Sequence, residues 1–288
     1  MTVGPRVVAL GGGGGLSITL TALRQYAGAI TAIVSVADDG GSSGRLRAAL
    51  GIPAPGDLRR CLVALGDPDS VWARSFEHRF STGELEGHPL GNLVIAGLAA
   101  ATGDFAAALR EAGRLVGAVG QVLPATSEPV VLVAESATGS ITGQVAVSEA
   151  GRIATVALQP AGAPTPWDAV DAIIAADQVV LGPGSLFTSV LPACLPREVT
   201  KALRRTRAQR VYVCNVVAVE RETEGFDVAA HVDALRAHGV EVDVVLADAK
   251  ALPLGEPDAH VVVADMAAGD GLRHDPKDLA TALSDLIR

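Results

Sequence analysis

The chain has 288 residues, a hydrophobic fraction of 49% and a formal net charge of −9, so it can bury one large core or two modest ones. Its basic residues form no long cluster and its aromatic fraction is only 3%, so nucleic acid is not an expected partner. Charged residues, 19% of the chain, interrupt every apolar run before the roughly 20 residues that a membrane span needs. The first residues also lack the zones of a signal peptide, and we therefore expect a folded cytoplasmic protein.

Short, almost continuous apolar runs recur along the chain, as they do in strands buried on both faces of a sheet. They are "RVVAL" at 6–10, "ITAIVSV" at 30–36, "QVVLG" at 178–182, "RVYVCN" at 210–215 and "HVVVAD" at 260–265. Helical patterns separate most of them, and the last helix is expected to begin with Asp275 as N-cap and Pro276 as its first residue. The alternation predicts an α/β fold with a Rossmann-like, doubly wound and mainly parallel sheet.

Two segments interrupt this alternation. From residue 46 to about residue 116 the pattern is helical without a convincing strand, and from 121 to 159 it is rich in strands. No low-complexity linker or internal repeat separates independent parts. We interpret the segments as a helical insertion and a small β-rich insertion within one domain that covers residues 1–288.

The stretch "VALGGGGGLSITL" at 8–20 places five glycines between an expected strand and an expected helix. Free backbone N–H groups and the helix dipole favour phosphate or diphosphate at such a point. A dinucleotide fingerprint starting at Gly11 or Gly12 would need Gly or Ala at Leu16 or Ser17, and a P-loop would need Lys in place of Leu16. The turn is therefore a phosphate loop of another kind, or a tight turn with no ligand.

A second polar stretch, "VADDGGSSGRLR" at 36–47, follows the second expected strand, at the edge where open α/β sheets bind ligands. Asp38 and Asp39 could bind ribose hydroxyls or Mg²⁺, and the hydroxyls of Ser42 and Ser43 suit phosphate oxygens. A flexible acidic turn is the alternative, because these residues are ordinary in loops.

Other candidate ligand-binding residues lie in separate segments of the chain. Asp57 in "PAPGDLRRCL" could cap a helix or supply a third carboxylate, and Asn92 in "GHPLGNL" could contact a ligand. The stretch "LGPGSLFTSVLP" at 181–192 repeats the strand, glycine turn and helix of the first stretch, with Gly184 and Ser185 in the turn. Asn215 would lie beside it.

Together these segments resemble the bacterial gluconeogenesis factor family, relatives of 2-phospho-L-lactate transferase. The resemblance runs in order through "GGGGGLS", "VADDGGSSGRLR", "PGDLRRCLVAL", "HRF", "GHPLGNL", "ATGDF", "VLPAT", "GPGSLFTSVLP", "VCNV" and "LRHD", across nearly the whole chain. One departure concerns the glycine turn, because Gly14 stands where the family commonly has threonine.

The resemblance implies a Rossmann-like cleft for a nucleotide sugar, UDP-N-acetylglucosamine in particular, and a role in cell shape, cell-wall synthesis and growth on gluconeogenic carbon sources. Asp38 and Asp57 would be the metal ligands if Mg²⁺ is a cofactor, and Arg273 would lie near the phosphates. A homodimer and an unidentified cell-wall regulatory protein are the partners expected. The predicted ligand-binding set is Gly12, Gly13, Gly14, Gly15, Ser17, Asp38, Asp39, Ser42, Ser43, Asp57, Asn92, Gly184, Ser185, Asn215 and Arg273.

Three functions are compatible with these motifs. A regulatory binding protein is favoured, because no nucleophile with its base stands out in them. The alternative is a Mg²⁺-dependent transferase acting at a nucleotide diphosphate, as the phospholactate transferases do. A nicotinamide oxidoreductase is disfavoured by the failed glycine fingerprint.

Overall fold

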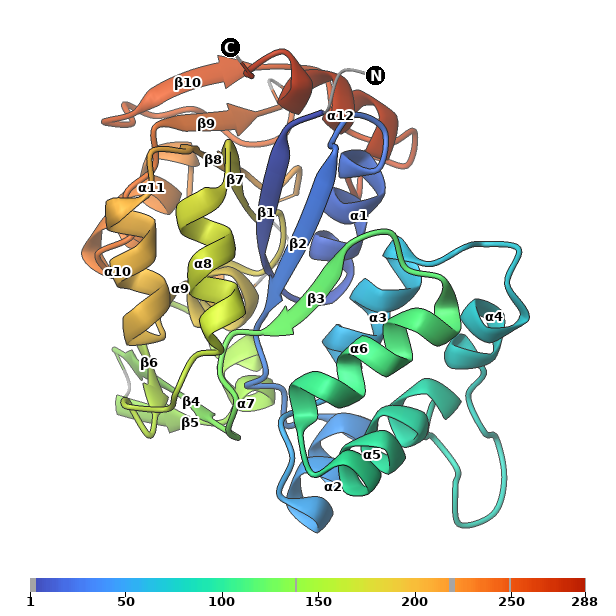
Figure 1. The fold of residues 1–288 in the computed structure, drawn as a ribbon. Helices are drawn as coiled ribbons and strands as arrows, with labels where there is room; N and C mark the ends of the chain where they lie inside the picture. The colour runs from blue at the N-terminus through green and yellow to red at the C-terminus, as the bar shows by residue number, and fades with distance from the viewer. Residues whose placement is uncertain (1–3, 138, 218–220, 249, 288) are drawn as a thin grey trace.

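The computed structural model describes residues 4–137, 139–217, 221–248 and 250–287. Its main sheet is parallel throughout, with strand order β10-β9-β8-β7-β1-β2-β3 (Figure 1). The strands are β1 (Arg6–Gly11), β2 (Ala29–Val34), β3 (Gln121–Pro124), β7 (Gln178–Leu181), β8 (Gln209–Val213), β9 (Val244–Ala247) and β10 (His260–Val263). The predicted α/β class with a doubly wound, mainly parallel sheet is confirmed.

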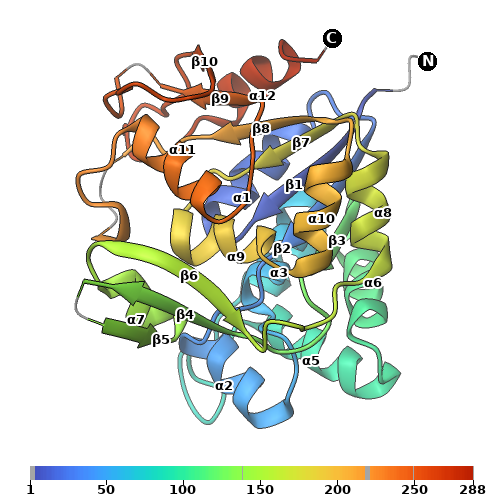
Figure 2. The same cartoon turned by 90° about the vertical axis from the view of Figure 1, so that its left-hand side faces the viewer.

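Helices cover both faces of this sheet (Figures 1 and 2). On one face α1 (Gly13–Leu23) packs against β1, α3 (Gly56–Leu65) and α12 (Pro276–Ser284). On the other face α8 (Trp167–Ala175) packs across β1, β2 and β3 and beside α10 (Arg197–Arg205). The short π-helix η1 (Leu186–Val190), α9 (Leu191–Cys194), the 3-10 helix η2 (Arg221–Thr223) and α11 (Val228–Ala237) complete the later half of the described chain.

The strand order reverses direction between β1 and β7. From β1 the chain proceeds through β2 to β3 on one side, whereas β7, β8, β9 and β10 follow one another on the other side. Such a reversal leaves a crevice at the carboxyl ends of the two central strands, because the connections leave them in opposite directions. The site is therefore expected beyond Gly11 and Leu181.

The core of the sheet explains why the strands could be predicted from apolar runs. Residues 7–10 of β1 and 179–181 of β7 are buried, and so are the whole of β9 and the last three residues of β8. At the chain's last helix Asp275 caps α12, because its carboxylate accepts from the N–H groups of Lys277 and Asp278. Among the described residues no helix is both long and apolar enough to cross a membrane.

The segment between β2 and β3 is helical. It contains α2 (Gly41–Leu50), α3, α4 (Val71–Glu77), α5 (Leu90–Thr102) and α6 (Phe105–Val116), which extend to the lower right of Figure 1. The cleft side of this segment is α2 and the start of α3, because α2 follows the loop after β2 and Gly56, at the start of α3, lies against Ser43 and Asp38.

The strands of the strand-rich segment belong to two different sheets. Its first strand, β3, joins the main sheet beside β2, and β4 (Val131–Ser136), β5 (Gly139–Thr142) and β6 (Ile153–Gln159) form a separate antiparallel sheet with order β5-β4-β6. Residues 144–149, which lie within the segment predicted to be rich in strands, form the helix α7 (Gln144–Glu149) instead. At this point a carboxylate from the loop after β2 caps α7, and this tertiary contact outweighs the local strand propensity.

That carboxylate is Asp39, which accepts from the N–H of Gln144 at 3.1 Å and of Val145 at 3.0 Å. We expect Asp39→Ala to cost about 1 kcal/mol of stability, the usual loss when a helix cap is removed. Amide hydrogen exchange should be accelerated in α7 while the main sheet keeps its protection. The exposed Asp69→Ala is a control, and unchanged exchange in α7 of the Asp39 variant would contradict this role.

Candidate functional site

Two glycine turns meet at the switch point of the sheet. After β1, Gly12 is the extended N-cap of α1 and Gly13 has φ +61°. After β7, the turn comes so close to α1 that a Cβ on Gly15 would lie 2.2 Å from the carbonyl oxygen of Pro183. The Thr19 hydroxyl donates to the carbonyl oxygen of Gly182 at 2.7 Å and fixes the approach. A glycine is therefore required at position 15 for steric reasons.

The first turn presents backbone donors. A helix start leaves its first N–H groups without partners inside the helix. The Asp57 carboxylate accepts from the N–H of Gly13, whereas the N–H groups of Gly14 and Gly15 have no hydrogen-bond partner among the described residues. Two such donors, with the helix dipole behind them, make a candidate anion site. A Cβ on Gly14 would meet nothing within 4 Å, so the position itself has space for a side chain.

A cavity of about 380 Å³ opens beside these donors. Its volume is in the range of small-molecule sites. Apolar side chains line much of it, and among the described residues that line it Arg273 alone carries a permanent charge. The lining consists of Gly14, Gly15, Ile18, Pro183, Gly184, Asn215, Val216, Val217, Leu272, Arg273 and His274.

Asn215, two residues after the end of β8, holds the second turn in place. Its Oδ1 accepts from the N–H of Gly184 at 3.0 Å and its Nδ2 donates to the carbonyl oxygen of the same residue at 3.2 Å. Gly184 has φ +136°, a conformation that other residues rarely adopt. Asn215 therefore positions the turn that forms one wall of the cavity.

We expect Asn215→Asp to lower stability by about 1–3 kcal/mol, because the Gly184 carbonyl would lose its donor and face a carboxylate oxygen. The new charge would also repel an anion in the cavity. Chemical denaturation measures the first effect and ligand titration the second. Asn215→Ser, which is smaller but neutral, separates the two, and equal anion binding by the Asp variant and the unmodified protein would exclude this role.

The opposite wall is a strap, residues 266–274, that follows β10. Two buried polar side chains anchor it: Asp248, after β9, accepts from the N–H groups of Met266 and Ala267 at 2.8 and 3.0 Å, and His274 Nε2 donates to the carbonyl oxygen of Cys214 at 3.0 Å. Burial lowers the pKa of His274 to about 4, so its imidazole is neutral at pH 7.

At the tip of the strap Arg273 projects into solvent beside the cavity. Its side chain is 70% exposed and forms an ion pair with Asp270 at 3.2 Å. An exposed pair of this kind is weak, so a phosphate could replace it. Leu272, 64% exposed, lies next to it on the cavity rim. The tip therefore combines one cation with one apolar side chain.

An acidic group lies on the other side of the first glycine turn. Asp57 forms an ion pair with Arg60 at 3.2 Å and its side chain is only 15% exposed. Burial and the nearby Asp38 carboxylate raise the pKa of Asp57, although Arg60 and the Gly13 N–H oppose the shift. The two carboxylates thus lie near each other, beside the first glycine turn but outside the cavity lining.

Other predicted residues lie in the helical insertion and bond to one another. Ser42 Oγ is 2.8 Å from His88 Nδ1 and accepts from Asn92 Nδ2 at 3.1 Å. Asn92 Oδ1 in turn accepts from the buried Arg59 at 3.2 Å. Ser43 is buried too, with its hydroxyl against the Cα of Gly56. This network joins α2, α3 and α5, so its immediate role is to shape the floor beside the acidic group.

The remaining predicted residues serve the turns. Ser17 Oγ donates to the carbonyl oxygen of Gly13 at 3.2 Å. Ser185 is the N-cap of η1, where the carboxylate of Glu222 accepts from the N–H of Phe187 at 2.9 Å. Asp39, as described above, caps α7.

The cavity thus brings together Gly14, Gly15, Gly184, Asn215 and Arg273 from the predicted set. The sequence analysis did not predict the lining residues Ile18, Pro183, Val216, Val217, Leu272 and His274, nor the anchor Asp248. The first five of these lining residues carry no chemical signal in the sequence, because they contribute only apolar surface or backbone. His274 could have been found from its place beside Arg273.

The fold and the site define a doubly wound α/β protein with a glycine turn and a cavity at the switch point of its sheet. The family model described as 2-phospho-L-lactate transferase CofD matches residues 7–277. A gluconeogenesis factor of Halalkalibacterium halodurans is 43% identical, over 83% of this chain and 76% of that protein. A relative of the same name in Mycobacterium leprae is 44% identical, over 97% and 85%.

The crystal structure of a UPF0052 family member from Bacillus halodurans superimposes with a TM-score of 0.91 at 37% identity, and the match covers 96% of this chain and 98% of that one. The chain therefore belongs to the gluconeogenesis factor family and is related to the phospholactate transferases.

Proposed function

We propose that the protein binds a nucleotide sugar, UDP-N-acetylglucosamine, and acts in the cytoplasm as a regulator of cell shape, cell-wall synthesis and growth on gluconeogenic carbon sources. The observation that carries the binding proposal is the pair of N–H groups at Gly14 and Gly15, which have no partner among the described residues and belong to a cavity lining that also contains Arg273. Such donors suit the diphosphate of the ligand. The sugar and the physiological role rest on the family resemblance.

Binding is favoured over chemistry because the polar side chains around the cavity are engaged in holding it. Asn215 uses both ends of its amide on Gly184, and His274 uses Nε2 on the carbonyl of Cys214. The Cys214 thiol, at the end of β8, has a pKa raised by burial to about 12, so it is no nucleophile at pH 7. These groups support a scaffold better than a proton relay.

A transferase acting at the nucleotide diphosphate is the second candidate, and the acidic group favours it. Mg²⁺ is commonly held by one or two carboxylates together with substrate phosphates. Asp38 and Asp57 fit that pattern, and a cation there would also relieve the repulsion that helps to raise the pKa of Asp57. The ion would supply charge neutralisation at the diphosphate, and the two carboxylates would hold it.

Calorimetric titration with UDP-N-acetylglucosamine, with and without Mg²⁺, tests both candidates. We expect Arg273→Ala to weaken binding at least tenfold, about 1.4 kcal/mol, in either condition. Asp38→Ala should remove only the increment due to Mg²⁺. Asp168→Ala, on the exposed start of α8 and away from the cavity, is the control with the same loss of a carboxylate.

Recovery of the ligand after titration decides between the candidates. Intact nucleotide sugar, in the presence of Mg²⁺ and acceptor alcohols, supports the regulator, whereas consumed nucleotide makes the protein a transferase. Absence of binding would overturn the nucleotide-sugar assignment, and titration with GDP would then test the ligand type of the transferase relatives. Tight binding of NAD instead would indicate an oxidoreductase.

A further inference from the structure

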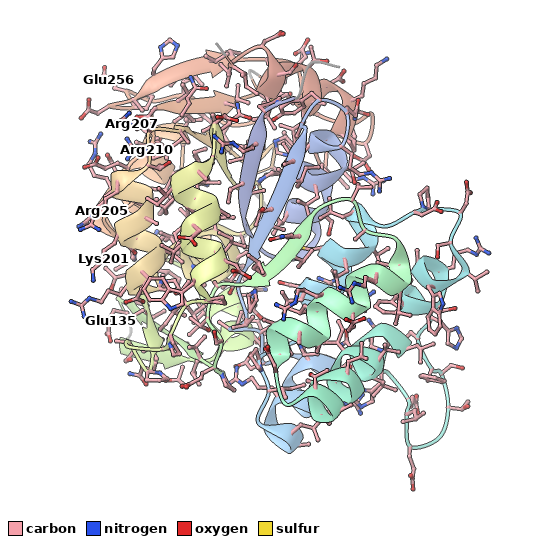
Figure 3. The ribbon with its side chains drawn as sticks, viewed as in Figure 1. Glu135, Lys201, Arg205, Arg207, Arg210 and Glu256 are labelled. Atoms are coloured by element: carbon pink, nitrogen blue, oxygen red, sulfur yellow. The ribbon has the colours of Figure 1, made fainter. Side chains whose placement is uncertain are left out.

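Helix α10, which lies in the chain between the second glycine turn and β8, collects basic side chains on its exposed face. Residues 197–210 contain six basic residues and one acidic one, a net charge of +5 in a chain of −9. Five of the six are exposed: Arg197, Lys201, Arg204, Arg205 and Arg207. Positions 197, 201, 204, 205 follow helical spacing, and Figure 3 shows Lys201, Arg205 and Arg207 projecting along one side of the molecule. We call these five residues the α10 basic face.

The cations of this face are not neutralised by the fold. Across the described parts of the chain, none of the five lies within 4.0 Å of a carboxylate oxygen. Their neighbour Arg210 differs, because it pairs with Asp243 at 2.7 Å and with Glu241 at 3.7 Å. The apolar side of α10 is already used, since Val199, Ala202 and Leu203 are buried in the core.

The adjacent helix adds apolar surface. Helix α8 packs beside α10, and the Thr206 hydroxyl after α10 donates to the carbonyl oxygen of Ile173 in α8 at 2.7 Å. On α8, Trp167 is 77% exposed and Ile174 is 45% exposed. Positions seven apart lie on the same side of a helix. Tryptophan and arginine are the residues that most often dominate the affinity of protein interfaces.

We propose that the α10 basic face, together with the exposed Trp167 on the neighbouring helix α8, is a docking surface for an acidic segment of another protein, one that carries carboxylates and at least one apolar side chain. The row from Arg197 to Arg205 is about 12 Å long, which matches a short segment. Guanidinium groups bind carboxylates in a bidentate manner, and Trp167 supplies a place for the apolar side chain.

The charge distribution favours a local protein segment over a bilayer or a nucleic acid. With +5 in residues 197–210, the other residues together carry −14. An extended anionic surface, such as a bilayer, would be repelled by this excess of negative charge. A polyphosphate backbone needs a longer basic footprint than this one. Because the apolar side of α10 is buried, the helix also has no face to insert into lipid.

The test uses Trp72→Phe, which leaves Trp167 as the only tryptophan of the 288-residue chain. Its fluorescence is followed during titration with an oligoglutamate peptide that carries one central leucine. We expect a saturable change that is lost at high salt. Adding Lys201→Glu and Arg205→Glu should weaken binding at least tenfold, and the milder Lys201→Gln and Arg205→Gln severalfold.

The control pair Arg110→Glu and Arg114→Glu, on α6, changes the net charge equally and should alter affinity less than twofold. Trp167→Ala, followed by calorimetry, should weaken binding about threefold. The proposal is overturned by the absence of saturable binding, by equal losses in the two charge-reversed pairs, or by tighter binding of phosphatidylglycerol vesicles or duplex DNA. None of these results depends on whether the cavity binds a nucleotide sugar.

Discussion

Gly15→Ala is expected to destabilise the protein by several kcal/mol and to abolish binding of the nucleotide sugar. The added methyl group would lie 2.2 Å from the carbonyl oxygen of Pro183 and 2.9 Å from the Cα of Gly184, and backbone cannot yield as a flexible side chain can. Forcing atoms into a packed site usually costs about 1–3 kcal/mol, and here both turns of the site would have to separate. Denaturant unfolding and calorimetric titration of the same preparation measure the two effects.

Gly14→Ala is the matched control, one residue away in the same turn. A Cβ there meets nothing within 4 Å, and no positive φ occurs at this position. Because alanine loses less backbone entropy than glycine in a helix, the variant should keep or gain up to about 1 kcal/mol. If Gly15→Ala proved as harmless as Gly14→Ala, the close approach of the two turns would be wrong.

Much of the fold was predictable because its strands are buried on both faces. The five apolar runs identified in the sequence correspond to β1, β2, β7, β8 and β10. Strand β9 was not predicted, because only four apolar residues stand between Asp243 and Asp248. Helix α10 was not predicted either, since its apolar stripe is narrow among charged residues. In both cases tertiary packing supplies what the local pattern lacks.

Local sequence patterns could not predict which distant segments contact each other. Strand β3 reads like the strands that follow it, yet it joins the main sheet, because its buried residues pair with Ala32, Ile33 and Val34 of β2. The start of α7 is helical because of a carboxylate 105 residues earlier in the chain, that of Asp39. Neither partner can be inferred from the segment itself.

The candidate site was likewise predictable where local patterns decide the structure and unpredictable where distant contacts do. Its glycine turns were predictable, because a glycine run between a strand and a helix has a known physical consequence. The roles of Ser42 and Asn92 were not, since a polar side chain near a cleft can face a ligand or another side chain. The strap could not be predicted either, because its anchors Asp248 and His274 form hydrogen bonds with backbone groups of residues distant in the chain.

His274 should make the stability of the protein fall steeply in mild acid. Its pKa is lowered by burial from 6.5 to about 4, so the folded state requires the neutral ring. A group with a lowered folded pKa of this kind gives full stability above pH 6.5, and that stability is lost as the pH falls from 6.5 towards 4. The expected loss from this residue is about 2 kcal/mol at pH 5 and about 3 kcal/mol at pH 4, relative to pH 7.5.

His274→Gln separates this effect from the general acid sensitivity of the chain. Glutamine can still donate to the Cys214 carbonyl but cannot be protonated in this range, so the variant should be less stable at pH 7.5 and lose about 2 kcal/mol less between pH 7.5 and pH 5. The buried His231, whose pKa is also lowered by burial, should still contribute its own loss in both proteins, and the exposed His78→Gln serves as the control for replacing a histidine by glutamine. Because His274 holds the strap that carries Arg273, acid should weaken ligand binding in the unmodified protein before it unfolds the sheet. Parallel acid losses in His274→Gln and the unmodified protein would mean that the ring is not the titrating anchor of the strap.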